Sequence, residues 1–177
     1  QARYVSAQHA QQISTLHEQP EGLALAREPE QYSKKFRYNQ RREQRLLEEA
    51  GGLIRPMLEL SSAEQAQIYA DLFQRRWGFP ATGKEHLAEV FGLLREFMIG
   101  SLIYLADQPV AIQVLYRVEA PGWISVEYIN GGVDPQQREF SPGSVLSFIN
   151  TQDAWAEARA LGKTLRYSFG RADREYK

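Results

Sequence analysis

The segment from Phe140 to Lys177 constrains the fold most, because it contains a helix and a strand with clear start and stop signals. A Ser-Pro-Gly entry precedes a long helical segment at about residues 143–161, and Gly162 supplies the stop. The strand expected at Thr164–Phe169 lies parallel to its predecessor, because a helical crossover joins parallel strands. The start of such a helix gathers unpaired N–H groups and positive dipole charge, which suits a phosphate-bearing ligand.

The upstream sequence predicts the rest of a sheet and its covering helices. We expect helices at Tyr32–Ala50, at about Ser61–Gly78 and at Lys84–Phe97, and the second of them has a capping box from Ser62 to Gln65. We expect strands at Leu53–Leu60, Met98–Ala106, Val110–Glu119 and Trp123–Asn130. A turn is expected at Asp107–Pro109, and Gly131-Gly132 is expected to end the last of these strands. Together these elements predict an α/β (α+β) fold with a mixed, mostly antiparallel sheet and helices on both faces.

The chain divides at about residue 31. Residues 1–31 are polar and Gln-rich, with a weak helix near 6–17, and are interpreted as a linker or the end of a preceding domain. Residues 32–177 are interpreted as one domain. Because the chain starts at Gln1 and stops directly after a motif, we interpret it as a fragment whose domain is truncated at its C-terminus.

Composition excludes several classes of site. The chain has no cysteine, so disulfides and cysteine-based metal sites are excluded, and its three histidines show no ligand spacing, so no metal site is expected. No apolar run approaches the roughly 18 residues that a membrane-spanning helix needs. The net charge of −1 says nothing by itself about partners, and a reducing cytoplasm is the simplest compartment.

The helix at Tyr32–Ala50 has a strongly basic face. Its cationic residues are Lys34, Lys35, Arg37, Arg41, Arg42 and Arg45. One interpretation is an ordinary solvated face. The other is a surface for an anionic partner, which includes acidic lipid headgroups, a phosphorylated substrate or RNA.

Three segments resemble a known superfamily. They are SKKFRYNQRREQRLLEEAGG at Ser33–Gly52, SPGSVLSFINTQDAWAEARALG at Ser141–Gly162 and YSFGRADREYK at Tyr167–Lys177. Together they resemble the GNAT superfamily of N-acetyltransferases, in the branch related to the Fem peptidoglycan aminoacyltransferases and the cellulose-synthesis-associated acetyltransferases. The chain as a whole is similar to bacterial macrophage-inducible proteins linked to antimicrobial-peptide resistance, which are associated with the inner membrane.

The resemblance implies a GNAT-like sheet with an acyl donor between its fourth and fifth strands. The coenzyme A pyrophosphate of such enzymes meets N–H groups in a Gln/Arg-x-x-Gly-x-Gly/Ala turn, which corresponds to Arg138–Ser144 here. This chain has one glycine in place of two, and Pro142 removes a donor. The donor is therefore left open between an acyl-CoA, another acyl thioester and an aminoacyl-tRNA, and no permanently bound cofactor is expected.

Two groups of candidate residues lie near the predicted helix start and strands. Ser141, Gly143 and Ser144 are expected either to hold phosphate or only to cap the helix. Glu127 is either a general base with a pKa raised by burial, or a solvated or ion-paired strand residue. Tyr167 is either a proton donor to a leaving thiolate or a core tyrosine.

The C-terminal GRADREYK motif supplies further candidates. The resemblance implies that Asp173 orients or deprotonates the acceptor, and that Arg171 or Lys177 holds an anionic group, with Tyr176 in the same motif. The alternative is that the motif only fixes the loop after the strand through an Arg–Asp pair.

These observations lead to two main functional hypotheses. The first is an N-acyltransferase-like domain that transfers an acyl or aminoacyl group from a donor to an amine acceptor and contributes to antimicrobial-peptide resistance. The second is a non-catalytic domain on the same scaffold that binds a ligand or an anionic membrane surface through the basic helix. A nucleic-acid binder has only that helix in its favour, and no DNA partner is expected. The expected location is the cytoplasm, peripheral to the inner membrane.

Overall fold

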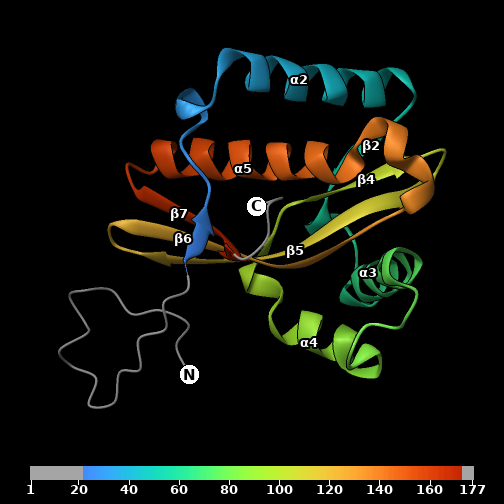
Figure 1. Cartoon of the computed structure of the whole chain (residues 1–177). Helices are drawn as coiled ribbons and strands as arrows, with labels where there is room; N and C mark the ends of the chain where they lie inside the picture. Colours follow the sequence, from blue (N-terminus) through green and yellow to red (C-terminus); the bar gives the residue numbers. More distant parts are fainter. Residues whose placement is uncertain (1–21, 173–177) are drawn as a thin grey trace.

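The computed structural model describes residues 22–172, in which a mixed seven-stranded sheet separates two layers of helices (Figure 1). The strands are β1 Leu23–Leu25, β2 Leu53–Pro56, β3 Met98–Ile99, β4 Ser101–Leu105, β5 Gln108–Ala120, β6 Trp123–Val133 and β7 Thr164–Arg171. Their order is β1-β7-β6-β5-β4-β2, with β3 paired to β5. Only β6 and β7 are parallel, so the prediction of a mixed, mostly antiparallel sheet is confirmed.

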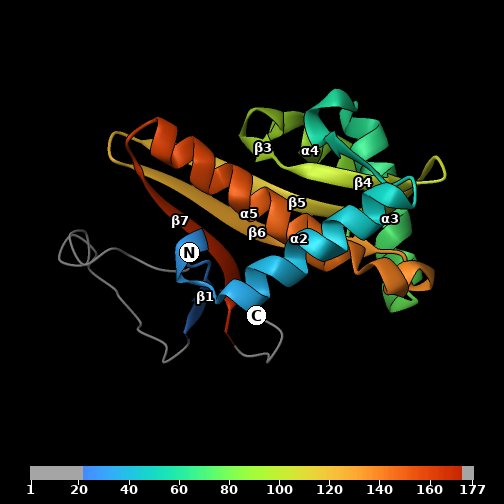
Figure 2. The ribbon, with the colours of Figure 1, turned by 90° about the horizontal axis from the view of Figure 1, so that it is seen from above.

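The helices cover both faces of the sheet (Figure 1). The α-helices are α2 Lys34–Glu49, α3 Ser62–Trp77, α4 Leu87–Leu93 and α5 Pro142–Ala160, and the 3-10 helices are η1 Pro29–Gln31, η2 Met57–Glu59, η3 Lys84–His86, η4 Arg95–Phe97 and η5 Pro135–Phe140. Helices α2 and α5 lie on one face, and α3 and α4 lie on the other. Seen from above, α2 crosses over α5 (Figure 2).

The two faces of the sheet carry separate cores, because successive side chains of a strand point in opposite directions. On β4, Leu102 packs with Tyr69, Leu72 and other residues of the α3/α4 side, whereas its neighbour Ile103 packs with Leu146 of α5. Alternating apolar residues of the central strands thus bury helices on both sides, which makes this sheet a rigid support for anything attached to its edges.

Several predicted boundaries differ from the structure for local reasons. The capping box of α3 joins Ser61 and Glu64, one residue earlier than predicted. The β4–β5 turn is formed by Ala106 and Asp107, both with positive φ, so Gln108 and Pro109 already belong to β5. The predicted helix at Lys84–Phe97 divides into η3, α4 and η4.

The pair Gly131-Gly132 was predicted to end a strand, but it lies inside β6. A Cβ atom on Gly132 would approach the Cβ of Leu72 in α3 to 2.5 Å. Gly132 therefore allows the sheet and α3 to come close together instead of breaking the strand.

The N-terminal boundary also differs from the prediction, because Leu23–Leu25 belongs to the sheet. This strand, β1, pairs antiparallel with β7, and Arg159 of α5 holds Glu30 at 2.6 Å. The domain therefore begins before residue 32. The weak helix predicted near residues 6–17 lies outside the described residues.

Candidate functional site

Strands β6 and β7 pair over only part of their length. Their parallel pairing runs from Trp123–Thr164 to Glu127–Ser168, and β6 then continues to Val133 without β7 beside it. Beyond the same point, β7 continues to Arg171 and pairs with β1. The two parallel strands therefore diverge, and the backbone edge of β6 is exposed to the space between them.

A bulge in β6 shapes this open edge. Val114 of β5 pairs with Asn130 and Leu115 pairs with Tyr128, so Ile129 has no cross-strand partner. The extra residue shifts the alternation of side chains. As a result Tyr128, before the bulge, and Gly131 and Val133, after it, line the same space.

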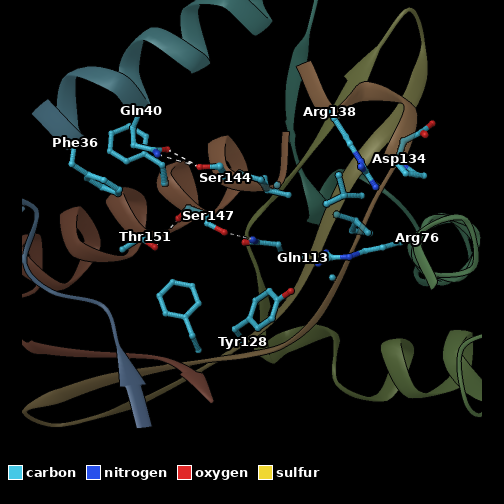
Figure 3. Close-up of a pocket in the computed structure, with 18 of the residues that line it drawn as sticks. Phe36, Gln40, Arg76, Gln113, Tyr128, Asp134, Arg138, Ser144, Ser147 and Thr151 are labelled. Carbon is cyan, nitrogen blue, oxygen red and sulfur yellow. Dashed lines mark hydrogen bonds between the residues drawn. The ribbon is translucent and has the colours of Figure 1, made fainter. Parts of the chain in front are cut away.

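A cavity of about 660 Å³ occupies this gap (Figure 3). Its walls come from α2 and the segment before it, the end of α3, strands β5 to β7, η5 and α5: Tyr32, Phe36, Gln40, Arg76, Ile112, Gln113, Tyr128, Gly131, Val133, Asp134, Pro135, Arg138, Gly143, Ser144, Leu146, Ser147, Phe148, Thr151 and Phe169. The volume lies in the usual range for small-molecule and cofactor sites.

Two arginines give one side of the cavity a positive character. Arg76 of α3 and Arg138 of η5 line the wall, and no salt bridge joins either of them to a carboxylate within residues 22–172 (Figure 3). The carboxylate on this wall, Asp134, is neutralised by Arg75 at 3.2 Å and accepts the Gln136 N–H. This side is therefore suited to an anionic group.

A buried chain of polar side chains forms the floor between the sheet and α5. The Gln113 amide donates to the Ser147 hydroxyl at 2.6 Å, and the Asn150 amide donates to the Gln113 oxygen at 2.9 Å. The backbone N–H of Ser101 donates to the Asn150 oxygen. Because Gln113 and Asn150 are almost fully buried, these bonds fix the orientation of the groups that reach the cavity.

The start of α5 brings the predicted phosphate residues to the cavity only in part. Gly143 and Ser144 line it, whereas Ser141 does not. Ser141 has a left-handed backbone with φ of 46°, and its carbonyl accepts the N–H groups of both Ser144 and Val145. The Ser144 hydroxyl exchanges hydrogen bonds with the Gln40 amide of α2 at 3.1 and 3.2 Å.

Glu127 lies at the last residue pair that joins β6 to β7. Its neighbours Ile124 and Val126 pack with Ala154 and Ala158 of α5, so alternation directs Glu127 to the opposite face of the sheet. There Arg166 lies 3.9 Å from its carboxylate, and burial lowers the pKa of that arginine. Glu127 does not line the cavity but lies at the point where the strands diverge.

Among the tyrosines of strands β6 and β7, Tyr128 reaches the cavity, and it was missed at the level of sequence. Tyr167 is 1% exposed, packs in the core on Phe169 and does not line the cavity. Burial raises the pKa of its hydroxyl well above the ordinary value. The alternation of β6 was the signal that could have favoured Tyr128, together with the polar and aromatic residues of neighbouring elements.

The remaining predicted residues are distributed differently. Arg171 is exposed at the end of β7, opposite Leu23, while Asp173, Tyr176 and Lys177 lie outside the described residues. On α2 the predicted basic residues are exposed, except Arg37, which is half-buried. Within residues 22–172, no cluster of three metal-ligating residues and no helix able to span a membrane is present.

Comparisons with known proteins agree with this geometry. The Mig-14 family model matches the chain over residues 1–177. A possible acetyltransferase from Clostridium difficile 630 is similar in structure, with a TM-score of 0.52 at 11% identity over 70% of this chain and 82% of that chain. An aminoglycoside acetyltransferase from an uncultured soil metagenomic sample, in complex with sisomicin, has a TM-score of 0.53 at 17% identity over 73% and 84%. No curated protein sequence gives a significant match.

Proposed function

The chain belongs to the Mig-14 family and has a GNAT-like fold, and we propose that it is an N-acyltransferase domain that transfers an acyl group to an amine. The observation that supports this most is the divergence of β6 and β7 after Glu127 and Ser168, with a cavity in the gap. An open strand edge beside the start of a crossover helix can hold an extended donor and expose its reactive carbonyl in the middle of the sheet.

The proposed donor is an acyl-CoA thioester, with an aminoacyl donor as the alternative. Arg76 and Arg138 bind its anionic part beside the start of α5, where Gly143 and Ser144 line the cavity. The donor lies on the α5 face of the gap. The acceptor amine enters from the opposite face, where Glu127 lies.

The reaction is a direct transfer between donor and acceptor. The amine nitrogen attacks the thioester carbonyl, the C–N bond forms, and the C–S bond breaks as the thiolate leaves. Glu127 takes the proton from the amine, with Asp173 as the second candidate base. The Tyr128 hydroxyl returns a proton to the thiolate. Arg171, which is exposed, or Lys177 holds an anionic group of either substrate.

Thermal stabilisation by CoA and acetyl-CoA tests the donor site. A ligand that binds only the folded chain at 100 times its Kd stabilises it by about 2.7 kcal/mol, which corresponds to roughly 5–10 °C. We expect this shift to disappear in Gly143→Trp, which fills the cavity wall, and to persist in Gly92→Trp on the exposed side of α4. No shift with any CoA compound in the unmodified chain would contradict a CoA donor.

Release of free thiol in the presence of amines tests the chemistry. Aminoglycosides, cationic peptides and short polyamines form a suitable acceptor panel. We expect Glu127→Gln to lower kcat by about 10²–10⁴-fold while the shift with acetyl-CoA persists. Tyr128→Phe should lower kcat as well. If kcat falls in Tyr167→Phe and stays unchanged in Tyr128→Phe, Tyr167 is the proton donor instead of Tyr128.

A second function is supported by the basic surface of α2. Lys34, Lys35, Arg41, Arg42 and Arg45 are exposed on one helix, together with Tyr38, which is 64% exposed. We propose that this surface holds the domain against the anionic cytoplasmic face of the inner membrane, where acylation of an envelope amine or of a cationic peptide contributes to antimicrobial-peptide resistance. Flotation with vesicles that contain phosphatidylglycerol and with vesicles that lack it tests this proposal, and equal binding to both would contradict it.

A further inference from the structure

The two sides of the cavity differ in chemistry. Arg76 and Arg138 lie on one side, and Phe36 and Thr151 lie on the other (Figure 3). Aromatic rings continue the second side: Phe36 stacks on Tyr32 with ring centroids 4.9 Å apart, and the remaining rings are those of Phe148, Tyr128 and Phe169. A ligand that fills the whole cavity therefore needs an anionic part and an apolar part.

The start of α5 offers few free groups for the anionic part. The N–H groups of Ser144 and Val145 are already donated to the Ser141 carbonyl, and Pro142 has none. The Ser144 hydroxyl is occupied by Gln40. The arginine side chains are thus the available groups for phosphate oxygens, and Arg138 stands beside the helix start.

The aromatic side is larger than an acetyl group requires. Five aromatic rings from α2 and its preceding segment, β6, β7 and α5 face one space, and Phe36 is still 42% exposed. Exposed aromatic surface inside a concave site is most stabilised by an apolar ligand group. The polar side chains on this side include Gln40, Thr151 and Tyr128. The Gln40 amide is bonded to Ser144, and the Thr151 hydroxyl is donated to the Ser147 carbonyl.

We propose that the cavity selects a donor with a medium-length apolar acyl chain over acetyl, with the acyl chain on the aromatic side and the phosphates at Arg76 and Arg138. The inference rests on the proposed function and specifies its donor. Burial of each added methylene is expected to tighten binding by up to roughly fourfold. Affinity then rises with chain length until the aromatic side is filled.

Calorimetric titration of the unmodified chain with CoA, acetyl-, butyryl-, hexanoyl- and octanoyl-CoA tests the proposal. We expect octanoyl-CoA to bind at least tenfold more tightly than acetyl-CoA. Phe36→Ala should remove most of that difference and leave acetyl-CoA affinity within about twofold, because acetyl does not reach the ring. Phe79→Ala is the matched control, since Phe79 has a similar exposure of 55% and lies outside the cavity.

The anionic side is tested with the same ligands. Arg138→Gln should weaken CoA and every acyl-CoA by the same factor, about tenfold or more for a charge-assisted hydrogen bond lost from a phosphate. Arg55→Gln, an exposed arginine of β2 outside the cavity, should weaken none of them.

The outcomes separate this inference from the proposed function. Equal affinity for acetyl- and octanoyl-CoA in the unmodified chain, with acetyl transfer to an amine, overturns the chain-length preference and keeps the acyltransferase. A preference that Phe36→Ala does not alter places the acyl chain elsewhere and also overturns it. The absence of binding by any CoA compound overturns both proposals.

Discussion

The two halves of β6 differ in what holds them. From Trp123 to Glu127 the strand is paired on both edges, and its inward side chains pack on α5. From Tyr128 to Val133 it keeps only β5 as a neighbour and contains the bulge, two glycines and the cavity wall. The same strand is thus a structural element in its first half and a binding surface in its second.

The residues beside the two halves of β6 also differ. Beside the first half, Arg117 contacts Glu157 and Glu119, and Lys163 adds a further ion pair to Glu119. Beside the second half lie Ser141, in a left-handed conformation, and the buried Gln113–Asn150 chain. Ion pairs thus lie beside the half of β6 that is paired on both edges, and a left-handed residue and buried amides lie beside the other half.

Substitution of the glycines at the two ends of β6 gives the largest contrast. In Gly132→Ala, the new Cβ would lie 2.5 Å from the Cβ of Leu72, so we expect a loss of about 2–3 kcal/mol in unfolding free energy. Gly122→Ala, in the turn before the paired half, has no atom within 4 Å of its new Cβ and should change stability by less than about 0.5 kcal/mol. Chemical denaturation measures both, and equal losses would contradict the comparison.

Removal of the buried Asn150 amide, which lies near the second half of β6, should lower the unfolding free energy by a similar or slightly smaller amount. Asn150→Ala leaves the Ser101 N–H and the Gln113 oxygen without their partner, which should cost about 2 kcal/mol. Asn39→Ala, on the exposed surface of α2, is the control. If the two variants unfold at the same denaturant concentration, the buried hydrogen bonds of Gln113 and Asn150 do not stabilise the second half of β6.

Relief of strain at the start of α5 should increase stability. Ser141→Gly removes the cost of a left-handed conformation at a non-glycine residue, but glycine loses more conformational entropy on folding. The net gain in unfolding free energy should be about 0.5–1 kcal/mol. Ser125→Gly, within the paired half of β6, should reduce stability instead. A loss of stability in Ser141→Gly would show that Ser141 contributes a contact that outweighs its strain.

The smallest effect concerns the ion pair that fixes the segment after β1. The hydrogen bond from Arg159 lowers the pKa of Glu30 from 4.5 to about 2. This pair therefore stabilises the fold above pH 4.5, and its contribution is lost as the pH falls toward 2. The melting temperature of Glu30→Gln should lie slightly below that of the unmodified chain at pH 7, and the difference should shrink as the pH falls from 4.5 toward 2, with the exposed Glu59→Gln as control.

Local patterns were sufficient to predict most of the fold. The stop at Gly162 and the alternation in β6 are signals within a few residues, and the corresponding elements are present. Strand β1 has only three residues, and its pairing depends on β7, so no local signal identified it. Gly131-Gly132 has the local signature of a break, but a glycine is needed at position 132 because α3 approaches the strand there.

The site was less accessible to sequence reasoning, because it depends on the relation between strands. Glu127 was identified by its position in a strand. Tyr128 was missed because it lies on the same side of the sheet as Tyr167, and only the divergence of β6 from β7 leaves Tyr128 at the cavity. The roles of Arg76 and Gln40 depend on where α3 and α2 pack, which no spacing in the sequence indicates.

The pairing of β1 with β7 has a consequence for how the chain folds during synthesis. Leu23 pairs with Arg171, 148 positions later, and α2 packs on α5 through contacts of comparable sequence separation. Long-range pairings of this kind slow folding, because loop closure precedes the contacts that compensate for it. At roughly 5–20 residues per second, the ribosome needs about 7–30 s to deliver β7 after β1. During that interval the basic helix α2 is exposed without its partner, which is the window in which a chaperone or an acidic surface would meet it.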